Sequence, residues 1–193
     1  MKLGFVFMAS GFGRRFGSNK LMHDLAGKPV YKYALESLFE AACELKKNHI
    51  LSLAVVSQYS EILADAEKSG LTAVFNSLSE TGITSSIKLG IENLPPAEKY
   101  AFFVADQPYL KPETTVNFIE AYLESGKTIG CVSSDNAFGN PVIFDRLYLP
   151  ELLALEGDRG GKRVVMEHLS EVFSFPVEKE ELTDIDAPSD IKK

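Results

Sequence analysis

The sequence predicts an α/β fold of three layers, in which helices cover both faces of a mostly parallel, twisted sheet. Short apolar runs of strand length alternate along the chain with longer segments whose apolar residues recur at helical spacing. Residues 100–105 form a near-continuous apolar run, as expected of a central parallel strand that is buried on both faces. An opening apolar run at residues 3–8 leads directly into a glycine-rich turn.

The elements follow one another as strand, loop and helix. Strands are predicted at residues 3–8, 50–56, 71–75, 100–105, 128–133, 141–144 and 172–177. Helices are predicted at residues 29–47, 61–68, 85–93, 112–123, 146–155 and 162–169. Pro29 suits a first helical position, and Gly70 suits the end of a helix. Because ligands of such sheets bind beyond the carboxyl ends of the strands, we expect the functional residues in the loops that follow strands.

Composition narrows the class of protein. The length of 193 residues predicts one domain spanning residues 1–193. A net charge of -7 argues against nonspecific binding to nucleic acid, and no apolar run approaches the ~20 residues that span a bilayer. Residues 3–8 lack the cleavage pattern of a signal peptide, so they are interpreted as a strand. Cys43 and Cys131 are predicted to be two buried thiols in a reducing, cytoplasmic environment.

The loop after the first strand is rich in glycine and in positive charge. It contains Gly11, Gly13 and Gly17, and its cations are Arg14, Arg15 and Lys20. Glycine lets backbone amides approach an anion closely, and arginine suits a bidentate grip on phosphate. The spacing fits neither the Walker A motif nor the dinucleotide-binding fingerprint. The loop predicts a phosphate-binding site, and a flexible loop with solvated cations is the alternative.

Two further polar blocks follow predicted strands. Residues 76–90 form a polar loop that leads to hydroxyl groups at a helix start, where free amides suit an anion or the edge of a nucleobase. Ordinary helix capping by Thr84 or Ser85 is the alternative. Asp106 follows the apolar strand at residues 100–105, and such a carboxylate is a good Mg²⁺ ligand. A turn capped by Asp106 is the alternative there.

The loop pattern A-x-G-x-G-x-R-x-G-x-x-K at residues 9–20 resembles the signature of the molybdenum cofactor nucleotidyltransferases, in particular their cytidylyltransferase branch. Further segments are similar to that family in the same order along most of the chain. They are Asn76, Gly82, Ser86 and Gly90, then Asp106-Gln107-Pro108, Gly139-Asn140-Pro141, Gly157-Asp158, and Asp184-Ile185-Asp186. Ser77 replaces a proline of the family pattern.

The resemblance implies a Rossmann-like nucleotidyltransferase fold and a reaction. CMP would pass from CTP to the phosphate of molybdenum-bound molybdopterin, giving molybdopterin cytosine dinucleotide and pyrophosphate with Mg²⁺ as cofactor. The implied catalytic residues are Arg15, Lys20 and Asp106; the nucleotide-binding residues are Ala9, Ser10, Gly11, Gly13, Arg14, Asn76, Gly82 and Ser86; the acceptor-binding residues are Gly139, Asn140, Pro141 and Asp158; the metal ligands are Asp106 and Asp186.

The choice of nucleotide base stays open in the sequence. In the family the cytidylyl branch tends to read A-A-G after the first strand and the guanylyl branch A-G-G, whereas this chain has Ala9-Ser10-Gly11. Ile83 stands where the isoprenoid cytidylyltransferases typically carry arginine, which weakens that reading. The alternatives are a guanylyl- or sugar-phosphate nucleotidyltransferase, and a non-catalytic accessory protein that hands cofactor to a molybdenum hydroxylase.

Overall fold

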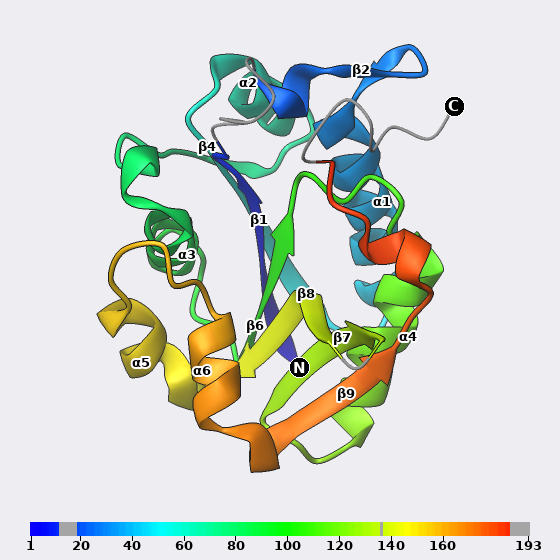
Figure 1. Ribbon diagram of the computed structural model, residues 1–193, viewed down its shortest axis with the longest axis vertical. Coiled ribbons are helices and arrows are strands. Elements are labelled where there is room, and N and C mark those ends of the chain that lie inside the picture. Colours follow the sequence, from blue (N-terminus) through cyan, green and yellow to red (C-terminus); the bar gives the residue numbers. More distant parts are fainter. Residues whose placement is uncertain (12–18, 136, 186–193) are drawn as a thin grey trace.

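The computed structural model describes residues 1–11, 19–135 and 137–185, and its main feature is a sheet ordered β5-β4-β1-β6-β8-β7-β9 (Figure 1). The strands are β1 (Lys2–Ala9), β4 (Ile50–Ser57), β5 (Thr72–Phe75), β6 (Lys99–Val104), β7 (Ile129–Ser134), β8 (Ala137–Asp145) and β9 (Val172–Pro176). Among the described residues of this sheet, only β8 pairs antiparallel with its neighbours. The predicted mostly parallel sheet is therefore confirmed.

Helices cover both faces of the sheet, as the sequence predicts. They are α1 (Val30–Leu45), α2 (Ser60–Lys68), α3 (Ile83–Glu92), α4 (Pro112–Glu124), α5 (Leu149–Ala154) and α6 (Lys162–Glu167). Residues of α1, α2 and α4 pack with Phe5 and Phe7 of β1, whereas residues of α3, α5 and α6 pack with Val6 and Met8. Figure 1 shows α3, α5 and α6 together on the left and α1 and α4 on the right. The alternation of side chains along β1 thus builds two apolar cores.

Helix α3 lies unusually close to the central strand. A Cβ atom at Gly90 would stand 2.2 Å from Cγ1 of Val6, so any larger residue there would push the helix away from the sheet. Glycine costs a helix interior about 1 kcal/mol in intrinsic propensity relative to alanine. That cost is offset by the close packing of the last turn of α3 on the middle of β1.

The direction of β8 corrects one part of the prediction. The strand begins at Ala137 rather than at residue 141, so Gly139-Asn140-Pro141 lies inside the strand and not in a loop before it. Because β8 is antiparallel to β6, with Phe102 opposite Val142 and Lys99 opposite Asp145, its beginning lies at the edge where β6 ends. The rule that functional blocks follow strands is therefore wrong for this block, although the block still reaches the expected edge of the sheet.

Smaller differences concern the helices and the thiols. Pro29 belongs to β3 (Lys28–Pro29), which pairs with β2 (Asp24–Leu25), and α1 begins one residue later. The predicted helix at residues 146–155 is a 3₁₀ turn followed by α5. Cys131 is buried, but Cys43 is exposed on α1, so the prediction of two buried thiols is wrong for Cys43. Within the described ranges, no helix has both the length and the apolar character needed to cross a membrane.

The half-buried carboxylate of Asp65 joins α2 to α1. The Tyr31 hydroxyl donates to Oδ2 of Asp65 at 2.7 Å, and Nζ of Lys32 lies 2.9 Å from the same oxygen. These two hydrogen bonds, with Lys32 contributing most, lower the pKa of Asp65 from 3.8 to about 2. The carboxylate therefore stabilises the fold above its unfolded pKa, and this contribution is lost as the pH falls through the folded pKa.

Asp65→Asn is expected to lower the free energy of unfolding at neutral pH by about 1–2 kcal/mol, because a charge-assisted pair is replaced by a neutral amide. The difference between wild type and variant should shrink as the pH falls from about 4 toward 2, where the wild-type carboxyl group takes up its proton. Urea unfolding across this range measures it. Glu44→Gln is the control, because the Glu44–Lys47 pair is exposed. A difference that does not change with pH would contradict the assignment.

Candidate active site

The residues at the end of β1 are held by the segment that follows β4. The hydroxyl of Ser57 donates to the carbonyl oxygen of Ala9 at 2.8 Å, and Nε2 of Gln58 donates to that of Ser10 at 2.8 Å. The hydroxyl of Tyr59 donates to the carbonyl oxygen of Gly11 at 2.9 Å. Ala9, Ser10 and Gly11, which the sequence predicts to bind nucleotide, therefore lie at the carboxyl end of the sheet in a fixed backbone.

Asn76 connects this backbone to the start of α3. Its side chain is fully buried, and Nδ2 lies 2.9 Å from Oγ of Ser85, 3.0 Å from Oγ of Ser86 and 3.3 Å from Oγ of Ser10. Its Oδ1 accepts the backbone N–H of Leu78 at 3.0 Å. Since an amide carries two N–H donors, the three hydroxyls share them. The structure thus brings together Ser10, Asn76 and Ser86, three of the predicted nucleotide-binding residues.

The start of α3 is capped by a distant carboxylate. Oδ1 of Asp158 accepts the backbone N–H of Ile83 at 3.1 Å, and Gly82 precedes that residue with a φ of 103°. A Cβ at Gly82 would meet Cα of Asp158 at 2.7 Å, so both the backbone angle and the contact require glycine. The alternative of capping by Thr84 or Ser85 is wrong, because Asp158 supplies the helix cap.

The predicted acceptor residues do not form one group in the described structure. Asp158 lies against Gly82 and Ile83, beside the residues predicted for the nucleotide. A Cβ at Gly139 would instead meet Leu182 at 3.0 Å, on the other side of β6. Gly139, Asn140 and Pro141 therefore remain one candidate group on β8, and Asp158 stands apart from it.

An ion pair lies at the middle of the same edge. Nζ of Lys20 lies 2.6 Å from Oδ2 of Asp106, and the lysine is only 8% exposed. Lys20 begins a 3₁₀ turn that Asn19 caps by accepting the N–H of Leu21 at 3.1 Å. Asp106 follows β6 directly, as predicted. Two of the three residues that the family resemblance implies as catalytic are thus in contact.

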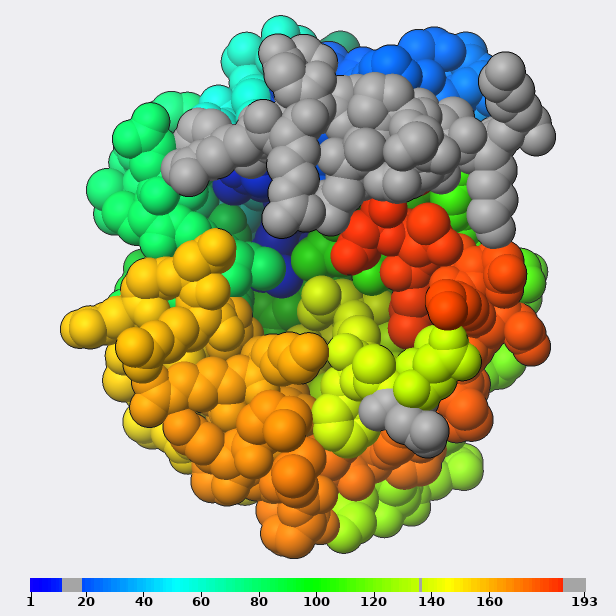
Figure 2. All heavy atoms as spheres, viewed as in Figure 1, coloured from blue at the N-terminus to red at the C-terminus, as the bar shows by residue number. Residues whose placement is uncertain are grey.

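The C-terminal segment packs beside Asp106. The N–H of Ile185 donates to the carbonyl oxygen of Asp106 at 2.9 Å, and Nε2 of Gln107 donates to Oδ1 of Asp184 at 2.9 Å. The predicted residues Gly13, Arg14, Arg15 and Asp186 lie outside the described residues. Figure 2 shows the molecule hollowed on this face between the green segment around α3 and the red segment before residue 185.

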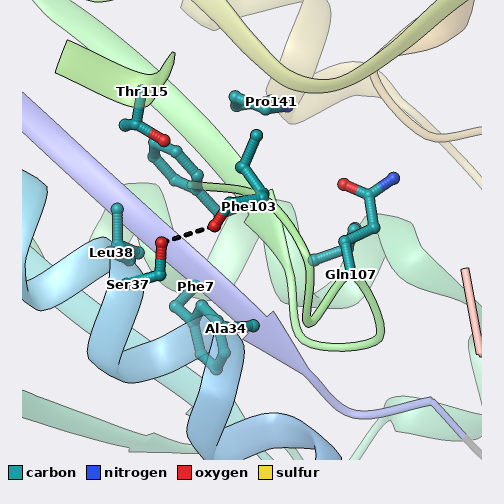
Figure 3. Close-up of a pocket in the computed structure, with 10 residues that line it drawn as sticks. Phe7, Ala34, Ser37, Leu38, Phe103, Gln107, Thr115 and Pro141 are labelled. Atoms are coloured by element: carbon teal, nitrogen blue, oxygen red, sulfur yellow. Dashed lines mark hydrogen bonds between the residues drawn. The ribbon is translucent and has the colours of Figure 1, made fainter. Parts of the chain in front are cut away.

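A separate cavity beneath the Asp106 turn is too small to be the ligand site. It has room for about one water molecule, and its walls are mostly apolar side chains of β1, α1 and β6 together with Pro141 (Figure 3). The hydroxyl of Ser37 donates to the carbonyl oxygen of Leu110 at 2.5 Å beside it. This cavity is therefore not a candidate for substrate binding.

The sequence analysis does not include the residues at the end of β4. Ser57 is the last residue of that strand, Gln58 and Tyr59 follow it, and all three donate to the backbone of residues 9–11. The rule that polar residues just beyond parallel strands are functional, applied to β4, would have found them.

Comparison with known proteins shows the family and the fold. A family model described as the MobA-like NTP transferase domain matches residues 5–172. The chain belongs to this family. Its fold is that of a nucleotidyl transferase from Methanothermobacter, with a TM-score of 0.78 at 18% identity over 98% of this chain and 94% of that one.

Individual relatives are more distant. A probable molybdenum cofactor guanylyltransferase of Thermococcus gammatolerans is 32% identical over 139 residues, which are 70% of this chain and 64% of that relative, slightly less than two thirds of its length. The purine catabolism protein PucB of Bacillus subtilis is 26% identical over 96% of this chain and 92% of its own. Rv0371c of Mycobacterium tuberculosis has the same fold, with a TM-score of 0.79 at 20% identity over 97% of this chain and 94% of that one.

Asn76→Ala is expected to lower the free energy of unfolding by roughly 2 kcal/mol, because it removes a buried donor shared by three hydroxyl groups. Asn93→Ala is the matched control. Asn93 also donates through its amide, to the carbonyl oxygen of Leu89 at the other end of α3, but it is exposed and should cost well under about 1 kcal/mol. Chemical denaturation of both variants tests the difference, and equal losses would disprove the central role of Asn76.

Proposed function

We propose that this protein is a Mg²⁺-dependent nucleotidyltransferase that transfers CMP from CTP to the phosphate of molybdenum-bound molybdopterin, releasing pyrophosphate. The observation that carries the proposal is the contact between Lys20 and Asp106 at the strand ends of a MobA-like NTP transferase domain. One residue is a cation suited to phosphate and the other is a carboxylate suited to a divalent metal.

Lys20 is the proposed partner of the nucleotide phosphates. It follows the glycine-rich loop, and a Cβ at Gly11 would lie 3.9 Å from Cε of Lys20, so the lysine is adjacent to the backbone of that loop. A fixed cation beside backbone amides stabilises the charge that develops on the leaving pyrophosphate. Arg14, Arg15 and Gly13, outside the described residues, are proposed to extend the same phosphate site.

Asp106 is the proposed metal ligand. Among the described residues, no group of three His, Cys, Asp or Glu side chains is arranged to hold a metal. Mg²⁺ typically takes one or two carboxylates together with substrate phosphates and water, so Asp106 fits this chemistry. Asp186 is the second proposed ligand. When bound, the ion neutralises charge on the reacting phosphates.

The ion pair explains how both charges are kept in a partly buried site without substrate. An isolated charge there would lose hydration without compensation, whereas Lys20 and Asp106 compensate each other. With substrate bound, Lys20 would pair with the nucleotide phosphates and Asp106 would hold the metal ion, so neither charge would be left unpaired.

The sheet order divides the two substrates. The nucleotide residues Ser10, Asn76 and Ser86 belong to the side of β1, β4 and β5, whereas Gly139, Asn140 and Pro141 belong to β8, with β6 and Asp106 between. We therefore place the acceptor on the β8 side. There an open groove is lined by residues of β7, β8 and β9, including Ser133, Phe138 and Ser174. Transfer then occurs over Asp106, where the acceptor phosphate can approach in line. Asp158 stays a proposed acceptor contact that would reach the substrate from the α3 side.

The preference for CTP is supported by the segments Gly139-Asn140-Pro141 and Gly157-Asp158 and by the spacing of Asn76 and Gly82, which resemble the cytidylyl branch. Ser10 does not decide between the bases, because its side chain is buried between the carbonyl oxygen of Val56 and the amide of Asn76. GTP is the second candidate, because the Thermococcus relatives are named guanylyltransferases. Delivery of the product to a molybdenum hydroxylase is part of the proposal.

The deciding experiment measures Mg²⁺-dependent pyrophosphate release with molybdenum cofactor, comparing CTP with GTP. We expect release with CTP. Preference for GTP would assign the guanylyl reaction. Pyrophosphate release only when a sugar phosphate is supplied in place of the molybdenum cofactor would show that the acceptor is a sugar phosphate. Nucleotide binding without any release would favour an accessory protein instead.

Lys20→Ala and Asp106→Asn are each expected to reduce turnover at least about 100-fold, because each removes a charge that stabilises the transition state. Asp106→Asn should also remove the Mg²⁺ dependence of nucleotide binding. Lys99→Ala is the matched control. The Lys99–Asp145 pair has the same 2.6 Å distance and similar burial, with side chains 12% and 23% exposed against 10% and 22%, but lies at the opposite edge of the sheet.

Lys99→Ala should lower stability and leave turnover per folded molecule unchanged. Steady-state pyrophosphate release and thermal unfolding, measured on the same samples, separate the two effects. If Lys20→Ala and Lys99→Ala reduce turnover alike, the pair at Asp106 is structural and the assignment is wrong.

A further inference from the structure

We infer that Gln58 and Tyr59 are positioning residues, which hold the backbone after β1 with its amide groups turned toward the nucleotide phosphates. Neither residue belongs to the nucleotide-binding set predicted from the sequence. The inference rests on the proposed function, because it assigns a role within the same site.

The first step concerns three successive carbonyl groups. The carbonyl oxygens of Ala9, Ser10 and Gly11 accept hydrogen bonds from the side chains of three successive residues, Ser57, Gln58 and Tyr59, at 2.8, 2.8 and 2.9 Å. Ala9 is the last residue of β1 and lies opposite Ser57, the last residue of β4. Beyond that point the two strands no longer pair, so side chains replace the backbone ladder as donors to the first loop.

The second step follows from the geometry of the peptide bond. In a trans peptide the N–H of each residue points opposite to the carbonyl group of the residue before it. The N–H groups of Ser10 and Gly11 therefore point away from the side chains that hold the carbonyls of Ala9 and Ser10. Successive amides exposed in this way attract anions, whereas carbonyl oxygens directed at a phosphate would repel it. Fixing the carbonyls on the β4 side leaves the amides for the ligand.

The third step concerns the link between the two donors. Nε2 of Gln58 donates both to the carbonyl oxygen of Ser10 and, at 3.3 Å, to the hydroxyl of Tyr59, which in turn donates to Gly11. The N–H of Tyr59 donates to Oγ of Ser57 at 3.0 Å, which fixes the start of α2 on the same network. Burial raises the pKa of Tyr59 above its ordinary value of 10.0, so its hydroxyl keeps its proton at neutral pH.

The fourth step places this network at the chemistry. The Tyr59 hydroxyl acts on Gly11, the residue whose Cβ position lies 3.9 Å from Cε of Lys20. Gln58 acts on Ser10, whose side chain contacts Asn76. The network therefore acts on phosphate binding through the backbone of residues 9–11, and it touches neither the reacting atoms nor the base directly.

The test compares Tyr59→Phe and Gln58→Met with wild type. Each variant keeps the apolar volume and removes the donor to the loop. Isothermal titration measures the affinity for Mg–CTP and, as a probe of the phosphate site alone, for inorganic tripolyphosphate. Loss of one hydrogen bond should lower the affinity of Tyr59→Phe for both ligands about three- to tenfold. The affinity of Gln58→Met should fall further, because this variant loses two hydrogen bonds. KM for the nucleotide should rise by the same factor, with kcat at saturation retained and the ratio of CTP to GTP affinity unchanged.

Tyr122→Phe is the control, because its hydroxyl also donates to a backbone carbonyl, that of Thr128 at 3.1 Å, before β7 and away from the site. It should change stability without changing either affinity. If Tyr59→Phe and Gln58→Met bind both ligands as tightly as the wild type does, the inference is overturned. The proposed function still stands in that case, provided that the wild-type protein turns over its substrates. A wild-type protein that binds neither nucleotide nor tripolyphosphate would overturn both. Affinity losses equal to those of Tyr122→Phe would also overturn the inference.

Discussion

The pairing of β1 on both sides is the constraint on which the site depends. The strand bonds to β4 along its whole length and to β6 over most of it, and residues 3–9 are buried. Its end cannot move without breaking the centre of the sheet. Because Asp106 follows the neighbouring strand β6 and Gln58 follows β4, the end of β1 has a polar residue beside it on each side. The paired strands thus fix the positions of the polar residues that follow them more precisely than loops alone would.

Many of the strands and helices could be predicted, because the spacing of apolar residues that marks them can be read over a short stretch of sequence. The uniformly apolar strand before Asp106 is sufficient to place that carboxylate at the edge of a parallel sheet. The direction of β8 follows from a connection that the expected bounds hide. The strand begins at Ala137, not at residue 141, and the link from Ser134 of β7 is too short for a parallel crossover, so the two strands pair antiparallel. Gln58 and Tyr59 look like ordinary loop residues until their partners, 48 positions earlier in the chain, are known.

The two ion pairs at opposite edges of the sheet show why geometry alone does not define a site. Lys20–Asp106 and Lys99–Asp145 have the same separation and almost the same exposure. The difference lies in what surrounds them. Lys99 and Asp145 are opposite residues of paired strands, so they close an edge of the sheet. Lys20 and Asp106 instead come from separate segments, one before α1 and one after β6, and meet beside Gly11 at the carboxyl edge of the sheet. There, in the proposed function, a phosphate and a metal cation would each bind one member of the pair.

The antiparallel direction of β8 places its first residues at the same edge of the sheet as Asp106, on the side where we propose that the acceptor binds. If β8 ran parallel to β6, its early residues Gly139-Asn140-Pro141 would lie at the edge far from Asp106. Because β8 instead runs antiparallel to β6, these residues lie at the same edge of the sheet as the proposed nucleotide-binding residues, but on the other side of β6. In the proposed reaction the two substrates would therefore not compete for the same strand ends. Their phosphates would meet over Asp106, whose proposed metal ion would neutralise them, and the order of strands allows an approach from both sides of β6.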